Sequence, residues 1–535
     1  MRGVNWIRLV ERVIIVCAVI FVGVLHVLLF LHAGALWRDE ANSAAFAAMP
    51  SVSSIASLLG CDHFPIGSSL ILRVWSSVSS SDRGLRLFGL LVGIGIIAAL
   101  WLTSRMFGFG APLIGIALVG LNSTAIVYGD AVRPYGVGAL VIVAVAGLVW
   151  RMTRSNSPYI LAAAIVSAVL SVQCLYQNSI FVFAICTTGA VVALGHRDWR
   201  ATVSILGVGA ISAISLVPYI GAIRQNRDWG VVWQSSTDLG ELWGVVLEAL
   251  GGSWTFSAGA WIGLVALGIP LAVWHLFGRA RARNVQQEIL LFSIITLTLS
   301  AAGFLAFIKD LAVPSQPWYY LQLIAIGAVC LDGIFVVLST RWAIQVVRLA
   351  MIPVVIGTAG LSLWDAVHVR ATNVDVIASQ LRSKASPEDF VVVNPWHIGV
   401  SFRRAYHGPG SWMTVPPIED LRIHRYDLLK QEMASESPLE PLLAGMQRSL
   451  SSGKRVWVIG GLIYPADGQT VSALPPAPHG PAGWNSADYL YVWTLQVGQF
   501  LKMHALWGEQ VDLPVDGAVS RFENEPLLLF EGWRP

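Results

Sequence analysis

Long apolar stretches recur through the first two thirds of this chain and limit how it can fold. A membrane-spanning helix needs about 20 mainly apolar residues, because the hydrocarbon core of a bilayer is about 30 Å thick. Of 535 residues, 55% are hydrophobic and only 13% are charged, whereas a soluble domain carries roughly 25% charged residues. The sequence therefore predicts a polytopic α-helical membrane protein with about eleven transmembrane helices. The apolar windows are approximately 12–34, 84–104, 111–128, 134–152, 158–175, 178–195, 201–222, 257–277, 287–308, 317–338 and 342–364.

The basic residues between these windows predict the orientation of the helices. Lys and Arg are enriched in the cytoplasmic loops of membrane proteins. If the N-terminus lies in the cytoplasm, the inner loops carry Arg105, Arg151, Arg154, Arg197, Arg200, Arg279, Arg281, Arg283 and Arg341. We therefore expect the longer segments between helices, and the C-terminal region, to lie outside the cytoplasm. The first apolar run is too long for the h-region of a signal peptide, so we expect an uncleaved first helix.

The C-terminal third of the chain has the composition of a soluble domain. The predicted elements are a helix over 373–384, strands over 389–394 and 454–460, a loop over 465–483 and a helix over 485–504. Alternating helices and strands are typical of an α/β domain. We expect a transmembrane domain over residues 1–364 and an α/β domain over 365–535. The first outer loop, residues 35–83, is expected to hold interfacial helices near 42–59 and 65–78.

Three ionisable side chains, Arg38, Asp39 and Glu40, follow directly after the first apolar window. Carboxylates at a bilayer boundary are costly unless they face water, a partner or a substrate. Adjacent side chains on a helix or strand point in different directions, so we expect Asp39 and Glu40 to have different tasks. We predict that Asp39 is a general base and that Glu40 orients a substrate hydroxyl, an arginine or a metal ion. The alternative is that both acids stabilise the start of a helix beside Arg38.

A second group of polar residues, Asp130, Arg133 and Tyr135, lies at another predicted outer boundary. We expect Pro134 to begin the next helix, since proline is tolerated in a first turn. Asp130 is predicted to lie across from Asp39 and to assist either that base or the acceptor substrate. Arg133 is predicted to bind the phosphate group of a donor substrate. The alternative is a helical ion pair between Asp130 and Arg133, which are three residues apart.

Further polar and aromatic residues near the outer boundaries are candidate ligands of a phosphate-bearing substrate. The predicted phosphate-binding residues are His63, Arg133, Arg224 and Lys309. The predicted substrate-binding residues are Arg38, Tyr135, Gln316, Tyr319 and Tyr320. An anionic lipid headgroup would suit Arg224 and Lys309 equally well. No cofactor is required by the sequence, although Glu40 or His63 would be the ligand of a divalent metal if one is used.

The ordered set of motifs resembles the superfamily of multi-spanning glycosyltransferases that use polyprenyl-phosphate sugars, known as the GT-C fold. The matching segments are Trp37–Glu40, His63–Pro65, Arg83–Leu87 and Asp130–Tyr135, and the resemblance covers roughly residues 10–360. Within this superfamily the chain looks most similar to the bacterial branch related to dolichyl-phosphate-mannose-protein mannosyltransferases and the lipid A aminoarabinose transferase.

This resemblance implies a catalytic transmembrane domain in a bacterial inner membrane, with an outward-facing site and inversion at the sugar carbon. It implies that Asp39 is the base, that the donor lipid lies in a groove between helices, and that the C-terminal domain covers the site outside the cytoplasm. The sequence departs from the family at Gln316–Tyr320, where relatives often have an arginine before a tyrosine. It also has His63 at a position where some relatives have lysine.

The leading hypothesis is therefore a membrane glycosyltransferase with a polyprenyl-phosphate sugar donor and a glycan, lipid or protein acceptor. One alternative is a polymerase or ligase of lipid-pyrophosphate-linked glycans. Another is a lipid-linked sugar transporter or flippase, which would predict polar groups within the helices and an internal repeat. The net charge of +3, without a basic cluster, makes nucleic acid an unlikely partner. The five cysteines do not suggest a disulfide framework.

Overall fold

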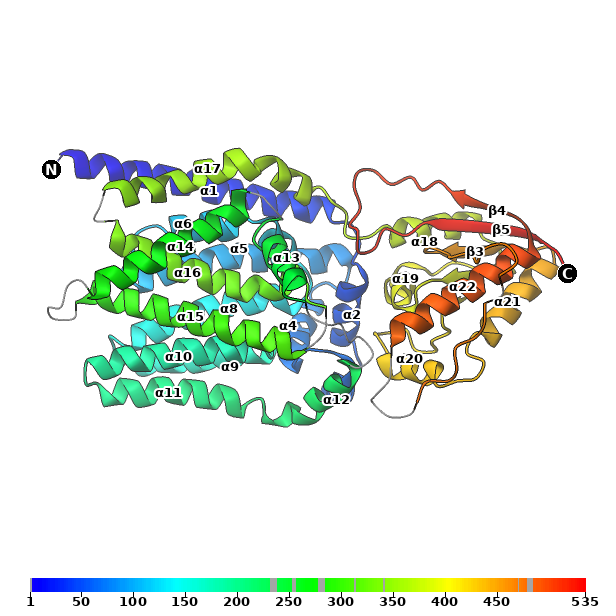
Figure 1. Ribbon diagram of the computed structural model, residues 1–535, viewed down its shortest axis with the longest axis horizontal. Helices are drawn as coiled ribbons and strands as arrows, with labels where there is room; N and C mark the ends of the chain where they lie inside the picture. Colours follow the sequence, from blue (N-terminus) through cyan, green and yellow to red (C-terminus); the bar gives the residue numbers. More distant parts are fainter. Residues whose placement is uncertain are drawn as a thin grey trace. The chain divides into compact units, whose positions relative to one another are not determined.

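The structure is a computed structural model that describes residues 2–230, 238–252, 256–277, 284–311, 314–339, 342–469, 471–478 and 485–535. Two compact units are present, and both are drawn in Figure 1. The helical unit comprises Met1–His32, Phe64–Ile220 and Ser236–His368. The mixed unit comprises Ala33–His63, Gly221–Ser235 and Val369–Pro535, so the first part of the predicted outer loop belongs to the same unit as the C-terminal region.

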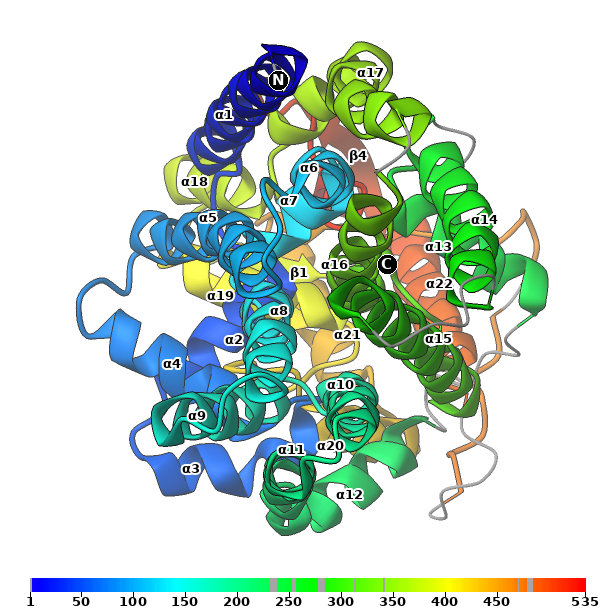
Figure 2. The ribbon, with the colours of Figure 1, turned by 90° about the vertical axis from the view of Figure 1, so that its left-hand side faces the viewer.

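The helical unit is built from long apolar helices. Its helices are α1 (Arg2–His32), α4 (Ile66–Ser76), α5 (Asp82–Met106), α6 (Leu113–Gly115), α7 (Ser123–Gly129), α8 (Pro134–Met152), α9 (Pro158–Cys174), α10 (Asn178–Gly195), α11 (Trp199–Ile214), α13 (Leu239–Ala249), α14 (Phe256–Phe277), α15 (Val285–Leu311), α16 (Leu321–Leu338) and α17 (Trp342–Val367). In the described ranges, nine helices are long and apolar enough to cross a membrane. Helix α8 packs against α5, α9, α10 and α16, as the view along the helices in Figure 2 shows. The predicted polytopic helical architecture is confirmed.

One predicted membrane window, residues 111–128, is not a continuous helix. It is divided into α6, a π-helical turn over Ile116–Gly120, and α7. The side chain of Asn122 accepts a hydrogen bond from the Ala125 amide at 3.0 Å and so begins α7 as a separate helix. The buried carboxylate of Asp332 accepts hydrogen bonds from the amides of Ile114 (3.0 Å) and Gly115 (2.7 Å). Asp332 thus provides the acceptors that the first-turn amides of α6 lack, and Asn122 does the same for α7.

In the described part of the chain, the number of helices long and apolar enough to span differs from the expected eleven for two reasons. Besides the interrupted window, helix α9 is an apolar helix that is shorter than the other spans. Helix α4 lies where an interfacial helix was predicted near residues 65–78. The arginines at positions 279, 281, 283 and 341, which contributed to the predicted orientation, lie outside the described residues.

The mixed unit contains a five-stranded sheet with strand order β2-β1-β3-β5-β4. The strands are β1 (Phe390–Val393), β2 (Ser411–Thr414), β3 (Val456–Ile459), β4 (Ala505–Val511) and β5 (Leu527–Trp533). Strand β1 pairs in parallel with β2 and β3, and β5 pairs antiparallel with β3 and β4. The helices are α2 (Arg38–Ala47), α3 (Val52–Ser57), α12 (Ile220–Gly230), α18 (Val374–Lys384), α19 (Gly399–Ala405), α20 (Tyr426–Met433), α21 (Glu440–Ser451) and α22 (Ser486–His504).

Helices cover both faces of this sheet. Val392 of β1 belongs to the buried cluster that includes residues of α21 and α22, whereas Val391 belongs to the cluster on the other face with α18 (Figure 1). Every residue of β1 and of β3 is buried, as expected of central strands covered on both sides. The predicted α/β class is confirmed, as are the helices and strands predicted near α18, β1, β3 and α22. The predicted loop over 465–483 lies partly outside the described residues, and its described part contains no helix or strand.

Strands β2, β4 and β5 were not predicted from the sequence. Strand β4 is largely exposed, so it lacks the continuous apolar run that identifies a buried strand. Strand β2 is short and exposed at its first residue. Strand β5 also pairs with β3, which lies far away in the sequence, and local patterning does not reveal such a partner.

The sharp turn after β3 depends on Gly460. Its φ angle is +95°, and a Cβ atom placed there would lie 1.7 Å from the carbonyl oxygen of Asn394. We predict that Gly460→Ala destabilises the mixed unit by about 1–3 kcal/mol, because the new methyl group meets rigid backbone at a strained φ. Thermal unfolding of the purified full-length protein would measure the loss.

The adjacent glycine provides a matched control for this prediction. A Cβ atom at Gly461 would meet no other atom within 4 Å. Gly461→Ala should therefore change stability by no more than about 0.5 kcal/mol. Equal effects of the two substitutions would contradict the assigned role of Gly460.

Candidate active site

The two adjacent acids of the first loop have different environments at the start of helix α2. Trp37 precedes the helix in an extended conformation, and its amide donates a hydrogen bond to Glu40 Oε2 at 3.4 Å. The Glu40 side chain is fully buried, with 0% exposure. This geometry corresponds to the alternative considered for Glu40, in which the acid stabilises the first helical turn.

Asp39 keeps a partly accessible carboxylate. Its side chain is 21% exposed, and Arg38 Nε lies 3.7 Å from Asp39 Oδ1. This separation is longer than the roughly 2.7–2.9 Å of a close charge-assisted hydrogen bond. The Arg38 guanidinium also lies over the Trp37 ring, with 5.6 Å between its carbon and the ring centroid. Of the two acids, Asp39 is therefore the one whose side chain a substrate hydroxyl can approach.

The start of α2 is held by Glu523, which is not among the site residues predicted from the sequence. The Arg38 amide donates a hydrogen bond to Glu523 Oε2 at 2.6 Å, and the Thr372 hydroxyl donates one to Oε1 at 2.8 Å. Glu523 is completely buried, and this burial raises its pKa to about 7, although the Arg38 amide and the hydroxyls of Ser401 and Thr372 favour the charged form. Because 485 positions separate Arg38 from Glu523 in the chain, no local sequence pattern reports this contact.

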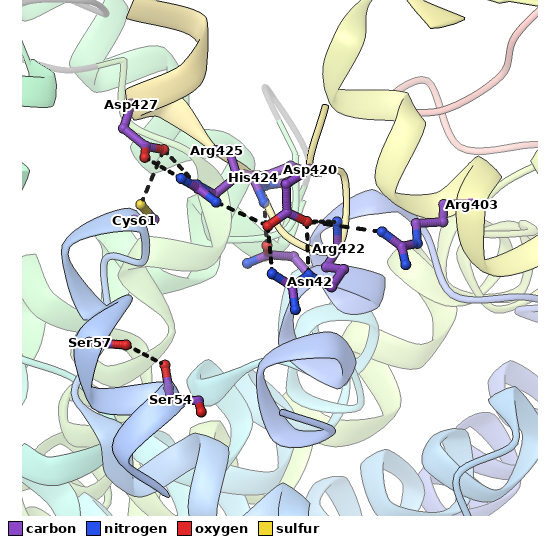
Figure 3. A network of polar contacts seen from close by, with 10 residues as sticks. All are labelled: Asn42, Ser54, Ser57, Cys61, Arg403, Asp420, Arg422, His424, Arg425 and Asp427. Carbon is purple, nitrogen blue, oxygen red and sulfur yellow. Dashed lines mark hydrogen bonds and ion pairs between the residues drawn. The ribbon is translucent and has the colours of Figure 1, made fainter. Parts of the chain in front are cut away.

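A loop of the C-terminal region, residues 420–427, is joined to two parts of the first loop. Asn42 of α2 accepts a hydrogen bond from the His424 amide at 2.8 Å, with its side chain buried. The Cys61 thiol donates a hydrogen bond to Asp427 Oδ1 at 3.5 Å. Burial and the nearby Asp427 carboxylate raise the pKa of Cys61 to about 12, so it stays a neutral thiol. Figure 3 shows both contacts.

The same loop carries a cluster of arginines around one carboxylate (Figure 3). Asp420 contacts Arg422 at 2.8 Å, Arg425 at 3.0 Å and Arg403 at 4.0 Å. The hydrogen bonds from Arg422, together with the charges of Arg422 and Arg425, lower the pKa of Asp420 to about 2 despite its partial burial. Asp420 is therefore ionised at neutral pH and organises this loop.

Two predicted phosphate-binding residues also belong to the mixed unit. His63 is exposed, and its ring centroid lies 5.9 Å from that of Tyr426. Arg224 is exposed on α12, and a Cβ atom at Gly60 would meet the side chain of the adjacent Gln225. Both residues are therefore exposed, and His63 has an aromatic neighbour in Tyr426.

In the helical unit, Asp130 is paired with a residue of α1. His26 Nδ1 lies 2.8 Å from Asp130 Oδ1 and 2.9 Å from Oδ2, and both side chains are buried. Glycines on α5 make room for this residue, since a Cβ atom at Gly89 would lie 1.8 Å from the Asp130 carbonyl oxygen and one at Gly93 would lie 1.8 Å from Oδ1. This environment supports a role for Asp130 in packing α1 against α5. The predicted catalytic role of Asp130 is supported by the family resemblance alone.

Asp130 and Arg133 do not share a helix, so the helical ion pair considered for them has no geometric basis. Asp130 follows the last residue of α7, and Arg133 directly precedes Pro134, the first residue of α8 as predicted. The carbon of the Arg133 guanidinium lies 4.7 Å from the centroid of the Phe64 ring and 5.9 Å from that of Tyr135. A guanidinium stacked on aromatic rings at the positive end of a helix is well placed to bind an anion.

Tyr319 is brought to the same cluster, which we call the Arg133 cluster and define as Arg133, Phe64, Tyr135 and Tyr319. The ring centroids of Tyr135 and Tyr319 are 5.9 Å apart. The side chain of Gln322 donates a hydrogen bond to the Tyr135 carbonyl at 2.9 Å and so ties α16 to the start of α8. The structure thus unites Arg133, Tyr135 and Tyr319, all of which were predicted from the sequence.

The remaining predicted residues of the helical unit have other environments. Gln316 is half-buried and directly precedes the short helical turn Pro317–Tyr320. Tyr320 is buried, with its ring against Phe304 and its hydroxyl donating to Ser315 Oγ at 3.3 Å. Lys309 is exposed in the last turn of α15. Burial of Tyr320 supports a packing role rather than contact with a substrate.

Glu40 or His63 was predicted to be the ligand of a divalent metal ion, if one is used. Within the described ranges, no group of three or more His, Cys, Asp or Glu side chains is arranged to hold a metal ion. Glu40 is committed to the start of α2.

Comparisons with known proteins give remote similarities only. No protein-family model and no curated protein matches the chain. Similar solved structures include ArnT from Cupriavidus metallidurans bound to undecaprenyl phosphate, at 12% identity over 84% of this chain and 92% of that one, with a TM-score of 0.49. The apo oligosaccharyltransferase of Archaeoglobus fulgidus matches at 9% identity over 83% of this chain and 69% of that one, also with a TM-score of 0.49.

The archaeal oligosaccharyltransferase AglB from Archaeoglobus fulgidus, in complex with an inhibitory peptide and a dolichol-phosphate, has a TM-score of 0.47 at 10% identity over 83% of this chain and 69% of that one. Because these TM-scores lie below 0.5, the functional proposal depends on the residues of this chain.

The His26–Asp130 pair generates a stability prediction. Leaving a buried polar group without its hydrogen-bond partner typically costs about 1–3 kcal/mol. We predict that His26→Ala and Asp130→Ala each lower the thermal unfolding temperature, and that the double substitution costs clearly less than the sum. A double-mutant cycle on the detergent-solubilised protein measures this coupling.

His32 is a suitable control on the same helix. Its Nδ1 lies 2.8 Å from the Leu28 carbonyl oxygen of its own helix. His32→Ala combined with Asp130→Ala should therefore give additive losses. Additivity for the His26 pair as well would refute the assigned coupling.

Proposed function

We propose that this protein is an inverting glycosyltransferase of a bacterial inner membrane. It takes a sugar from a polyprenyl-phosphate donor and transfers it to a glycan, lipid or protein acceptor on the extracytoplasmic face. The observation that carries the proposal is the separation of the two acids on α2, where Glu40 is fully buried and Asp39 keeps a partly exposed carboxylate. That difference provides one proton acceptor on a fixed helix, as such a reaction requires.

In the proposed reaction, Asp39 accepts the proton of the acceptor hydroxyl. The hydroxyl oxygen forms a bond to the anomeric carbon of the donor sugar while the bond between that carbon and the phosphate oxygen breaks. The phosphate oxygen leaves with the electron pair of the broken bond, so the lipid phosphate is released as an anion. Attack from the side opposite the leaving group inverts the configuration at the anomeric carbon.

The departing phosphate requires cationic groups and hydrogen-bond donors. Arg133 is the strongest candidate, because its guanidinium is held over two aromatic rings at the first turn of α8. Its planar fork of donors matches the geometry of a phosphate. The exposed side chains of His63, Arg224 and Lys309 are further candidates, and Tyr319 and Gln316 are proposed to contact the substrate. Tyr135 is buried, and we propose that its ring supports the Arg133 guanidinium.

The first test is Asp39→Asn in the purified, reconstituted protein. General-base assistance typically contributes about 10²–10⁴-fold, so we expect transfer to fall by at least 100-fold. The assay offers undecaprenyl-phosphate-linked mannose, glucose, galactose and aminoarabinose with envelope extract as acceptor, and measures release of undecaprenyl phosphate. Near-normal turnover in the variant would exclude Asp39 as the base.

Asp82 gives a matched control, because it is also a partly exposed acid in the first turn of a helix. Asp82→Asn should leave the rate unchanged. The same assay with undecaprenyl-pyrophosphate-linked sugars separates this proposal from the polymerase or ligase alternative, which predicts turnover only with the pyrophosphate donors.

The proposed orientation has its own test. The positive-inside distribution of arginines supports an extracytoplasmic C-terminus. A C-terminal fusion to alkaline phosphatase, which is active only outside the cytoplasm, should be active in cells, while the matching fusion to a fluorescent protein that folds only in the cytoplasm should be dark. The reverse result would overturn the orientation.

A further inference from the structure

The first turn of α2 depends on an acceptor from the C-terminal region. The amides at the start of a helix have no acceptor within the helix. At the start of α2, the Arg38 amide meets this need by donating to Glu523 Oε2 at 2.6 Å. The next residue in the chain is Asp39, so the contact lies one peptide away from the proposed base.

Glu523 is itself held rigidly. Its Oε1 accepts the Thr372 hydroxyl at 2.8 Å, and the Thr372 oxygen in turn accepts the Val374 amide at 3.0 Å at the start of α18. The Glu523 carbonyl accepts the Asn373 amide at 3.3 Å. With 0% exposure and these fixed partners, the side chain has little freedom to follow a movement of α2.

The residue beside Glu523 restrains the side chain beside Asp39. Arg38 Nη1 donates a hydrogen bond to the Phe522 carbonyl at 3.2 Å. This contact helps to hold the guanidinium in the arrangement where its Nε is 3.7 Å from Asp39 Oδ1.

A second attachment lies one helical turn further along α2. Asn42 accepts the His424 amide at 2.8 Å, and its side chain is only 3% exposed. Attachments at residues 38 and 42 therefore bracket Asp39 on both sides. Helix α2 has only ten residues and is too short to be stable by itself, so its orientation depends on contacts of this kind.

We propose that Glu523 is a positioning residue, which holds the first turn of α2 so that the Asp39 carboxylate is fixed for proton transfer. This inference rests on the proposed function of Asp39. In this proposal, Glu523 acts through the backbone of Arg38 and does not touch the substrate. The C-terminal region therefore has a part in the reaction that is distinct from acceptor binding.

The test compares Glu523→Ala and Glu523→Gln in the full-length protein, with the undecaprenyl-phosphate sugar that the wild type uses. A displacement of about 1 Å at a reacting group can cost about 100-fold in rate. We expect kcat to fall about 10- to 100-fold in Glu523→Ala, with KM for the donor changed by less than about threefold. Glu523→Gln should lose less, since its side-chain oxygen can still accept the Arg38 amide.

A second measurement does not depend on activity. Hydrogen–deuterium exchange of the amides in residues 37–47 should become at least about tenfold faster in Glu523→Ala, because the first turn of α2 loses its acceptor. Exchange in α21, which packs on the other face of the sheet from α18, serves as the internal reference. If the wild type transfers sugar from no lipid-phosphate donor, the proposed function fails, and the exchange measurement still decides whether Glu523 holds α2.

Asp389→Asn is the matched control for general destabilisation. Asp389 is a buried acid of the same unit, bonded to the Ser386 amide at 2.9 Å and to Arg455 Nε at 3.0 Å. This variant should lower thermal stability and leave both kcat and exchange of α2 unchanged. The inference is overturned if Glu523→Ala keeps kcat within twofold of the wild type, or if exchange of α2 stays the same.

Discussion

The cost of burying a polar group without a partner governs the structure of this protein from one end to the other. In the helical unit, Asp332 accepts the amides of Ile114 and Gly115, and Asp130 is paired with His26. In the mixed unit, Glu523 receives the Arg38 amide and the Thr372 hydroxyl. Each of these buried carboxylates has a partner from a distant part of the chain. An acid in a low-dielectric interior is tolerated only on this condition.

The same constraint gives the two acids at the start of α2 different environments. Glu40 lies inside the protein and closes the first turn of its own helix, whereas Asp39 stays partly exposed beside Arg38. The two neighbouring carboxylates therefore differ in burial and in hydrogen bonding. A partly solvated acid retains access to a substrate hydroxyl, and a fully buried acid that bonds to the backbone does not.

The mixed unit joins residues that are far apart in the chain into one structural element. Helix α2 is attached through Arg38 to Glu523 and through Asn42 to His424, while Cys61 contacts Asp427. The C-terminal region is thus the scaffold on which the first loop is built. In the helical unit, the Arg133 cluster is assembled in a comparable way, with Gln322 of α16 holding the backbone of Tyr135 at the start of α8.

The sequence by itself determined the membrane class, most of the helices, the central strands β1 and β3, and the start of α8 at Pro134. These features depend on apolar length, periodicity and proline geometry, which are local properties of the chain. It also identified Arg133, Tyr135 and Tyr319, which the fold brings together. Only the tertiary structure decided that Glu40 is buried while Asp39 is not, that Asp130 pairs with His26, and that Glu523 receives the Arg38 amide. Those outcomes depend on burial and on partners 104 and 485 positions apart in the chain, and local sequence patterns carry no information about such contacts.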